Sequence, residues 1–276
     1  MPTRHVVLAH GIFRFDMVRI LFRDHAHIDI GPHYFVGIAD FLRQHGFIVH
    51  ESDVNFCGSL VRRAADLQAR LEAILGAGDA DSLHIIGHSM GGLDARLVLA
   101  GNPAIAARIS CVTTIGTPHH GTTSADHALR FGGSVAIRLL RDFIDLEGFR
   151  DLTTSACAAF NERVEPLEAA NTVRYRVVAA EEENHLRVTP FLQPTWMQLK
   201  VEEGSSDGIV SRRSQEWVPT LVAADGRVKV VEQLSFPMPA DHLNEVGLWD
   251  PAELLGGLTT FEQRVKEFYL HLAETA

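Results

Sequence analysis

The segment SLHIIGHSMGG, residues 82–92, decides the fold of this chain. A short apolar run leads into Gly-x-Ser-x-Gly, and residues 91–100 then continue with helical character. A serine at such a strand–turn–helix junction stands on strained backbone, so Gly87 and Gly91, two residues to either side, must lack bulk. The pattern Gly87-His88-Ser89 therefore predicts a nucleophile whose hydroxyl is lifted clear of the sheet at the end of a strand, with the N-terminus of the next helix pointing at the reaction centre.

The pentapeptide Gly-x-Ser-x-Gly alone is weak evidence for a nucleophile, since chance produces it in about one of ten chains of this length. The surrounding pattern carries the prediction. Apolar runs typical of buried strands recur along the chain, at residues 5–9, 47–54, 109–116, 173–179 and 228–234. Apolar residues at helical spacing lie at 34–42, 60–74 and 261–272. Alternating strands and helices predict an α/β fold with a mostly parallel central sheet covered on both faces.

Residues 120–168 interrupt this alternation and hold many apolar residues. A long excursion between strands is usually functional when it is ordered. We expect a helical lid over the site at about 120–168, inserted in a single domain that spans residues 1–276. A plain surface insertion is the alternative.

Composition limits the possible functions. The 276 residues are 46% apolar and 22% charged, with a net charge of −10, which is typical of a soluble enzyme. An acidic chain without a basic run does not favour nucleic acid or anionic lipid. We expect no membrane insertion and no signal peptide, and hence the cytoplasm. The three widely spaced cysteines, Cys57, Cys111 and Cys157, predict buried free thiols and no zinc site.

A nucleophilic serine needs a base and an acid that orients the base. In folds that place a nucleophilic serine on such a strand–turn–helix junction, the chain order is Ser, then Asp or Glu, then His. Asp207, in Asp-Gly-Ile-Val beyond the excursion, has the position of the acid, and His242, after the last strand run, has that of the base. Both fall in loops at the carboxyl ends of strands, where open α/β sheets place their sites.

Competing assignments fit less well. Asp225 stands before a glycine in a turn, which needs no catalytic explanation. His185 precedes the acid, and His271 lies inside the last predicted helix. The pair His119-His120 has no third ligand at metal spacing, so we predict no metal there.

The oxyanion hole needs two backbone N–H groups aimed at the developing charge. Met90, the residue after the nucleophile, is expected to supply one. The loop after the first strand is expected to supply the other, from Ile12. His10 is then a residue that holds this loop.

Five segments resemble bacterial triacylglycerol lipases of the Pseudomonas and Burkholderia type. They are residues 8–12 (LAHGI), 87–92 (GHSMGG), 113–121 (TTIGTPHHG), 207–210 (DGIV) and 241–246 (DHLNEV). Residues 151–161 also resemble the lid region of those lipases. The resemblance implies an α/β-hydrolase fold with a mobile lid and acyl-ester substrates. It implies Ser89 as nucleophile, Asp207 as acid and His242 as base.

Departures from those lipases matter too. They are secreted and bind calcium through an Asp two residues after the histidine. Here Asn244 stands at that position, and Leu248 replaces a further polar ligand. Calcium prefers carboxylate oxygens, so we predict neither a metal nor another cofactor. These departures favour an intracellular esterase relative.

The predicted function is hydrolysis of carboxylic esters through a Ser-His-Asp triad and an acyl-enzyme. A thioesterase, amidase or acyltransferase shares the acyl-enzyme step and is not separated by sequence. A binding protein that uses the fold without catalysis is the alternative from another class. The sequence does not predict the oligomeric state.

Overall fold

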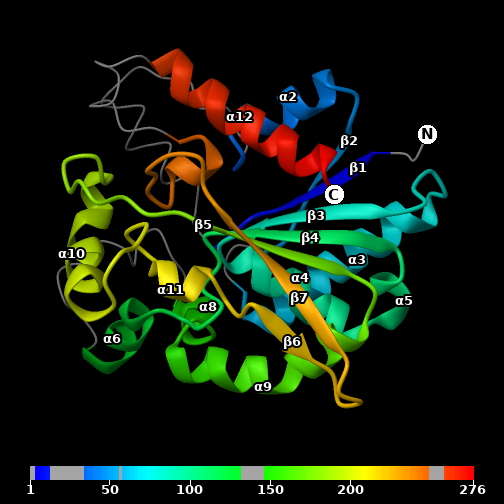
Figure 1. The fold of residues 1–276 in the computed structure, drawn as a ribbon, viewed down its shortest axis with the longest axis horizontal. Helices are drawn as coiled ribbons and strands as arrows, with labels where there is room; N and C mark the ends of the chain where they lie inside the picture. Colours follow the sequence, from blue (N-terminus) through cyan, green and yellow to red (C-terminus); the bar gives the residue numbers. More distant parts are fainter. Residues whose placement is uncertain (1–3, 13–33, 56–57, 132–145, 249–257) are drawn as a thin grey trace.

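The computed structural model describes residues 4–12, 34–55, 58–131, 146–248 and 258–276 (Figure 1). The strands are β1 His5–Ala9, β2 Ile48–Glu51, β3 Leu83–His88, β4 Ile109–Ile115, β5 Arg174–Ala179, β6 Thr220–Val222 and β7 Val228–Ser235. The α-helices are α2 Ile38–Gln44, α3 Leu60–Gly76, α4 Met90–Gly101, α5 Pro103–Ala106, α6 Thr123–Phe131, α8 Leu146–Arg150, α9 Thr154–Ala170, α10 Gln193–Glu202, α11 Arg212–Gln215 and α12 Leu258–Glu274. Short 3₁₀ turns are η1 Pro190–Leu192 and η2 Asn244–Val246.

The described strands form one sheet in the order β2-β1-β3-β4-β5-β7-β6. All neighbouring pairs are parallel except β6 with β7. This confirms the predicted α/β fold with a mostly parallel sheet. It adds β6, whose three residues are too few for the sequence pattern to reveal.

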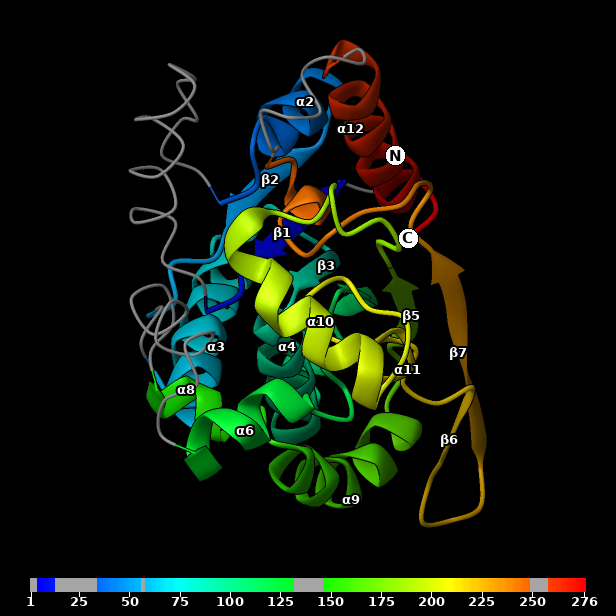
Figure 2. The ribbon, with the colours of Figure 1, turned by 90° about the vertical axis from the view of Figure 1, so that its left-hand side faces the viewer.

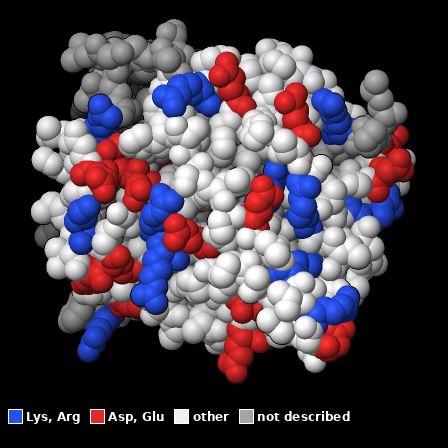
Figure 3. All heavy atoms as spheres, viewed as in Figure 1, with Lys and Arg blue, Asp and Glu red and all other residues white. Residues whose placement is uncertain are grey.

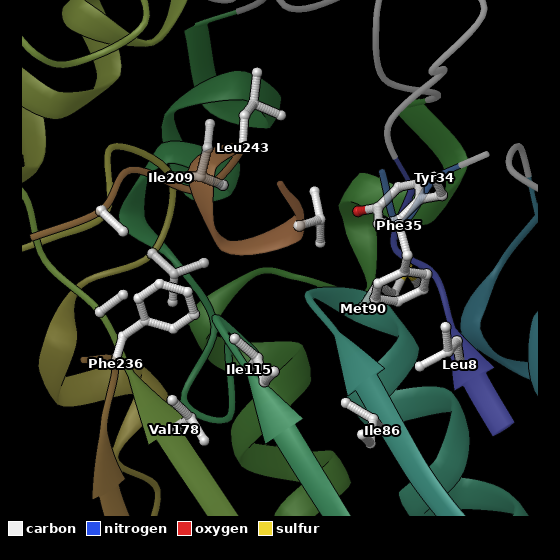
Figure 4. Packing of buried hydrophobic residues seen from close by; sticks show 14 of the residues in the cluster. Leu8, Tyr34, Phe35, Ile86, Met90, Ile115, Val178, Ile209, Phe236 and Leu243 are labelled. Atoms are coloured by element: carbon white, nitrogen blue, oxygen red, sulfur yellow. The ribbon is translucent and has the colours of Figure 1, made fainter. Parts of the chain in front are cut away.

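Successive side chains along each strand point to opposite faces of the sheet, so each face carries its own apolar layer. On β1, Val6 and Leu8 belong to the layer that includes α2 and α12, whereas Val7 and Ala9 belong to the layer that includes α3 and α4. Figures 1 and 2 show α2 and α12 together on one side of the sheet. Figure 4 shows the first layer across the strands, where Leu8 from β1 lies in a row with Ile86 from β3. Burial on both faces explains why the strands are apolar runs.

The strand order reverses beside β1. The chain runs from β1 to β2 on one side and then returns to β3 on the other side. In open α/β sheets such a reversal leaves a crevice beyond the carboxyl ends of the two strands. Residues 10–12 follow β1 and Ser89 follows β3, so the topology directs both segments to this crevice.

The predicted lid is described only in part, because residues 132–145 lie outside the described residues. Within it, α9 packs against α4, and the two helices share a buried ion pair in which Arg96 donates twice to Glu168, each time at 2.9 Å. The Arg96 guanidinium also lies 3.7 Å from the centre of the Trp217 ring. The lid itself stays a prediction.

Other sequence expectations concern the surface and the thiols. No helix among the described residues is long and apolar enough to cross a membrane. Acidic and basic side chains are interspersed over the face shown in Figure 3.

Cys111 and Cys157 are free and buried, as predicted, whereas Cys57 lies outside the described residues. Burial raises the pKa of the Cys157 thiol to about 12, so it remains protonated and unreactive.

Candidate active site

Ser89 connects β3 to α4 with a backbone that few side chains adopt. Its φ is 55° and its ψ is −132°, a conformation that costs about 1–3 kcal/mol and persists only where surrounding contacts impose it. A Cβ on Gly87 would lie 2.7 Å from the Gly92 nitrogen, and one on Gly91 would lie 2.2 Å from the Ala9 carbonyl oxygen. Both glycines are therefore sterically required, as the sequence pattern predicts.

The turn is held by the end of the neighbouring strand. The Ser89 N–H donates to the Ile115 carbonyl at 2.9 Å, and the Thr117 hydroxyl donates to the Ser89 carbonyl at 2.8 Å. The sequence analysis did not single out Thr117, whose role depends on the packing of β4 beside β3. These bonds leave the Ser89 side chain as the part of the turn available for chemistry.

Asp207 and His242 form a buried pair. The His242 Nδ1 lies 2.7 Å from the Asp207 Oδ2, and the His242 N–H donates to the Asp207 carbonyl at 2.8 Å. The backbone N–H groups of Ile209 and Val210 donate to the Asp207 Oδ1 at 2.8 and 2.7 Å. With both carboxylate oxygens held, Asp207 fixes the orientation of the His242 ring and leaves the proton of this ring on Nδ1.

Gln215 in α11 orients the same carboxyl. Its amide oxygen accepts from the Ala180 N–H at 2.7 Å, which turns the amide nitrogen toward Asp207 Oδ2, 3.1 Å away. Gln215 is buried, and no sequence motif marked it. Its contribution was missed because it depends on α11 packing behind the loop that bears Asp207.

His242 lies beside the serine turn. Its ring centre is 4.5 Å from that of His88, the residue before Ser89. The rival histidines His185 and His271 are exposed, and Asp225 is exposed in the β6–β7 turn, where it binds the Arg227 guanidinium at 2.8 Å. Among these candidates, the structure brings only Asp207 and His242 together beside the turn.

The loop after β1 closes against Ser89. A Cβ on Gly11 would lie 2.7 Å from the Ser89 Cβ and 3.1 Å from its Oγ. Arg63 from α3 donates to the His10 carbonyl at 2.7 Å and to the Gly11 carbonyl at 3.4 Å. Because C=O and N–H point in opposite directions across a trans peptide, this clamp directs the Ile12 N–H away from Arg63.

Two buried side chains stabilise that clamp. Asp94 in α4 accepts from the Arg63 Nη2 at 2.6 Å, and the His10 Nδ1 lies 2.8 Å from the Gly11 carbonyl. Burial and the nearby Arg63 charge lower the pKa of His10 to about 3, so this histidine is neutral and its Nδ1–H can donate to the carbonyl. His10 thus holds the loop, as expected from sequence.

Comparisons with known proteins show what this chain is similar to in sequence and in fold. A family model described as a PGAP1-like alpha/beta domain matches residues 40–132. A triacylglycerol lipase of Vibrio cholerae is 35% identical over 125 residues, which are 45% of this chain and 36% of that protein. One from Burkholderia plantarii is 38% identical over 128 residues, covering 45% and 32%. The chain thus matches about a third of the length of these curated relatives.

The fold comparison covers nearly the whole chain. The crystal structure of the mature lipase BlEst2 from Bacillus licheniformis superposes with a TM-score of 0.66 and 17% identity, over 94% of this chain and 91% of that one. The chain therefore has an α/β-hydrolase fold. The family match at 40–132 includes Ser89 and ends before Asp207 and His242, so any role for these two residues rests on the geometry of this chain.

Hydrogen bonds occupy the position at which the resemblance in sequence implied a calcium site. The Asn244 amide oxygen accepts from the Asp241 N–H at 3.1 Å, and its nitrogen donates to the Leu248 carbonyl at 2.9 Å. Asp241 itself accepts at one oxygen from the N–H groups of Leu243 and Asn244, and at the other from the N–H and hydroxyl of Thr189. Because donors already face these oxygens, the residues do not fit a calcium ion.

Other histidines of this chain have structural partners. His119 Nδ1 lies 3.0 Å from Arg96 and its Nε2 lies 2.9 Å from the Thr114 hydroxyl, while His120 Nε2 lies 3.1 Å from the Trp217 carbonyl. These contacts explain the pair without a metal. Ligand atoms of His88, His242 and Glu245 lie within 4.8 Å of one another, and hydrogen bonds within this group and to Asp207 account for that spacing.

Proposed function

We propose that this α/β-hydrolase cleaves carboxylic esters, with Ser89 as nucleophile, His242 as general base and Asp207 as the acid that orients it. The observation that carries the proposal is the buried Asp207–His242 bond of 2.7 Å beside the strained serine turn. A pure binding protein has no need of this combination. The sequence similarity to triacylglycerol lipases supports ester substrates.

In the proposed reaction, His242 Nε2 takes the proton from the Ser89 hydroxyl as its oxygen attacks the ester carbonyl. The N–H groups of Met90 and Ile12 donate to the oxyanion, and the N-terminus of α4 adds its positive potential. His242 then protonates the departing alcohol. Water, deprotonated by His242, attacks the acyl-enzyme and releases the acid and Ser89.

We propose that the acyl group lies against an apolar surface partly formed by α8. A Cβ on Gly148 in this helix would lie 3.6 Å from both the Ile12 side chain and the Met90 sulfur. Phe149 and Leu152 are buried beside it. Each methylene buried there would contribute about 0.8 kcal/mol, which favours aliphatic acyl chains and gives the predicted lid a role in binding them.

The test is hydrolysis of nitrophenyl esters from short to long acyl chains, by the wild-type protein and by Ser89→Ala. We expect the rate to rise with acyl length up to medium or long chains. We expect Ser89→Ala to lose at least about a thousandfold in kcat. Thr172→Ala, a change at an exposed hydroxyl in the turn before β5, serves as the matched control and should keep wild-type rates.

Equal rates for Ser89→Ala and wild type would overturn the assignment of the nucleophile. A thioester and an amide of the same acid, assayed in parallel, separate an esterase from the other acyl-transfer classes. A folded protein inactive on all three substrates would contradict the proposal and favour a binding role.

A further inference from the structure

Two carboxyl groups face the same side of the His242 ring. The His242 Nδ1 lies 2.7 Å from the Asp207 Oδ2 and 3.7 Å from the Glu245 Oε2. The Glu245 carboxyl also lies within hydrogen-bonding reach of the Asp207 carboxyl. All three side chains are fully buried. The proposed triad needs only one of these acids, so Glu245 requires a separate explanation.

Glu245 is held by a chain of hydrogen bonds that starts at the oxyanion loop. Its Oε2 lies 2.8 Å from the His88 Nε2, and the His88 Nδ1 lies 2.7 Å from the Tyr34 hydroxyl. The Gly11 backbone is hydrogen-bonded to this hydroxyl in turn. This series of hydrogen bonds therefore connects the loop after β1 to the Asp207–His242 pair.

The direction of these bonds follows from their donors. The Gly11 N–H donates to the Tyr34 oxygen, so the phenolic proton is free to donate to His88 Nδ1. Burial and the His242 ring lower the pKa of His88 well below its usual range, so its ring is neutral. With Nδ1 as acceptor, the single ring proton is on Nε2 and is donated to Glu245.

The surroundings of Glu245 do not favour a second negative charge. The titratable groups that face it are His88 from β3, Asp207, Asp241 and His242 from the loops, and Tyr34 and Tyr269. No lysine or arginine is among the described groups that act on its charge. Burial, together with Asp207 and Asp241, raises the pKa of Glu245 well above its usual range. Adjacent buried carboxyls cannot both ionise readily.

We propose that Glu245 is a positioning residue for His242 that stays protonated, accepting from His88 and donating its carboxyl proton to the Asp207 carboxylate. This inference rests on the proposed function. The neutral carboxyl braces the Asp207–His242 pair without adding a second negative charge beside the His242 ring. Because His88 directly precedes Ser89, the same series of hydrogen bonds fixes the position of His242 relative to Ser89.

The first test measures the protonation state without using activity. Histidine NMR titrations compare Ser89→Ala with the double variant Ser89→Ala/Glu245→Gln, and His242→Gln in the same background identifies the His242 signals. Glutamine reproduces a protonated carboxyl, since its oxygen accepts from His88 and its nitrogen donates to Asp207. We expect the His242 pKa to change by less than about half a unit. A fall of about one unit or more would show that Glu245 carries a charge, and would overturn the proposal.

The second test concerns positioning. We expect Glu245→Leu to lower kcat on a nitrophenyl ester by at least about tenfold with little change in KM, because the His88 donor and the Asp207 carboxylate lose their partner. Glu245→Gln should retain wild-type kcat and an unchanged acidic limb of the pH–rate profile. A Leu variant as active as wild type, or a Gln variant as impaired as the Leu variant, would overturn the proposal.

These outcomes are separate from failure of the proposed function. If the wild-type protein hydrolyses no ester, the triad proposal fails, while the NMR comparison still reports the charge of Glu245. If Glu245→Leu does not fold, Tyr34→Phe tests the same series of hydrogen bonds, because Tyr34 is bonded to His88 and His88 to Glu245. We expect it to lower kcat several-fold with its KM preserved, and a wild-type kcat in this variant would overturn the role of the chain.

Discussion

At Gly116, the turn after β4 leaves room for the Glu245 carboxyl. A Cβ there would lie 2.1 Å from the Glu245 Oε2, and the backbone φ is +58°. We predict that Gly116→Ala lowers the free energy of unfolding by about 2 kcal/mol or more, through left-handed strain and displacement of Glu245. Urea unfolding measures the loss, and ester hydrolysis should fall with it because Glu245 shifts.

Gly226→Ala is the matched control. Gly226 also has a positive φ, +84°, but a Cβ on it would meet nothing within 4 Å. We expect the free energy of unfolding of this variant to fall by about 1 kcal/mol, the cost of a side chain in left-handed backbone, and its activity to stay unchanged. Equal losses in the two variants would show that the contact with Glu245 has no energetic weight.

Asn244 gives a residue-scale prediction about metal dependence. Its amide bridges the Asp241 N–H and the Leu248 carbonyl across the loop that carries His242. We predict that a chelator changes neither the melting temperature nor ester hydrolysis, whereas Asn244→Ala lowers both stability and kcat by releasing this loop. Chelator-induced inactivation that added calcium reverses would contradict this prediction.

The residues recognisable from sequence are those whose role fixes local spacing. Gly87 and Gly91 flank the serine because the turn excludes their side chains. Asp207 and His242 follow strands in the order that the fold requires. The contact between His88 and Glu245 joins residues 157 positions apart, and no local pattern marks it. Thr117, Gln215 and Glu245 act on residues elsewhere in the sequence, so no local pattern assigns them a role.

At the scale of elements, Arg63 connects α3 to the oxyanion loop and to α4. Its guanidinium is buried and binds the Asp94 carboxylate and the carbonyls of His10 and Gly11. We predict that Arg63→Leu lowers the free energy of unfolding by about 3–5 kcal/mol, because Asp94 is left as an unpaired buried charge. Chemical denaturation measures this loss.

The double variant Arg63→Leu/Asp94→Leu separates stability from function. Replacing both charges by apolar groups should recover most of the stability. We expect kcat to stay at least about tenfold below wild type, because the carbonyls of the oxyanion loop lose their donor. Recovery of wild-type kcat in the double variant would show that Arg63 has no role in orienting this loop.

Elements differ in how well periodicity predicts them. Central strands such as β1 and β3 are buried on both faces, so their apolar runs are continuous. The edge strand β6 has one buried residue among three and gives no such signal. Most of α9 lies in the predicted lid segment, but the sequence does not indicate which surface this helix covers, and the structure packs it against α4 through Arg96 and Glu168.

For the whole molecule, buried neutral histidines link stability to pH. Burial lowers the pKa of His84, His88 and His119 well below the usual value, and that of His10 to about 3. In the unfolded chain each imidazole binds a proton below a pH of about 6.5. The unfolded state therefore binds more protons on acidification. The stabilisation is complete above pH 6.5 and is lost as the pH falls toward the folded-state pKa.

His119 provides the test of this linkage, because its two ring nitrogens contact Arg96 and Thr114 inside the protein. A histidine that protonates only on unfolding contributes a slope of at most about 1.4 kcal/mol per pH unit. We predict that between pH 6 and pH 4 the stability of His119→Gln falls less steeply than that of wild type by up to this amount. Urea unfolding across that range measures both slopes, with His45→Gln, an exposed histidine, as the control. Parallel curves for His119→Gln and wild type would show that His119 is protonated equally in the folded and unfolded states.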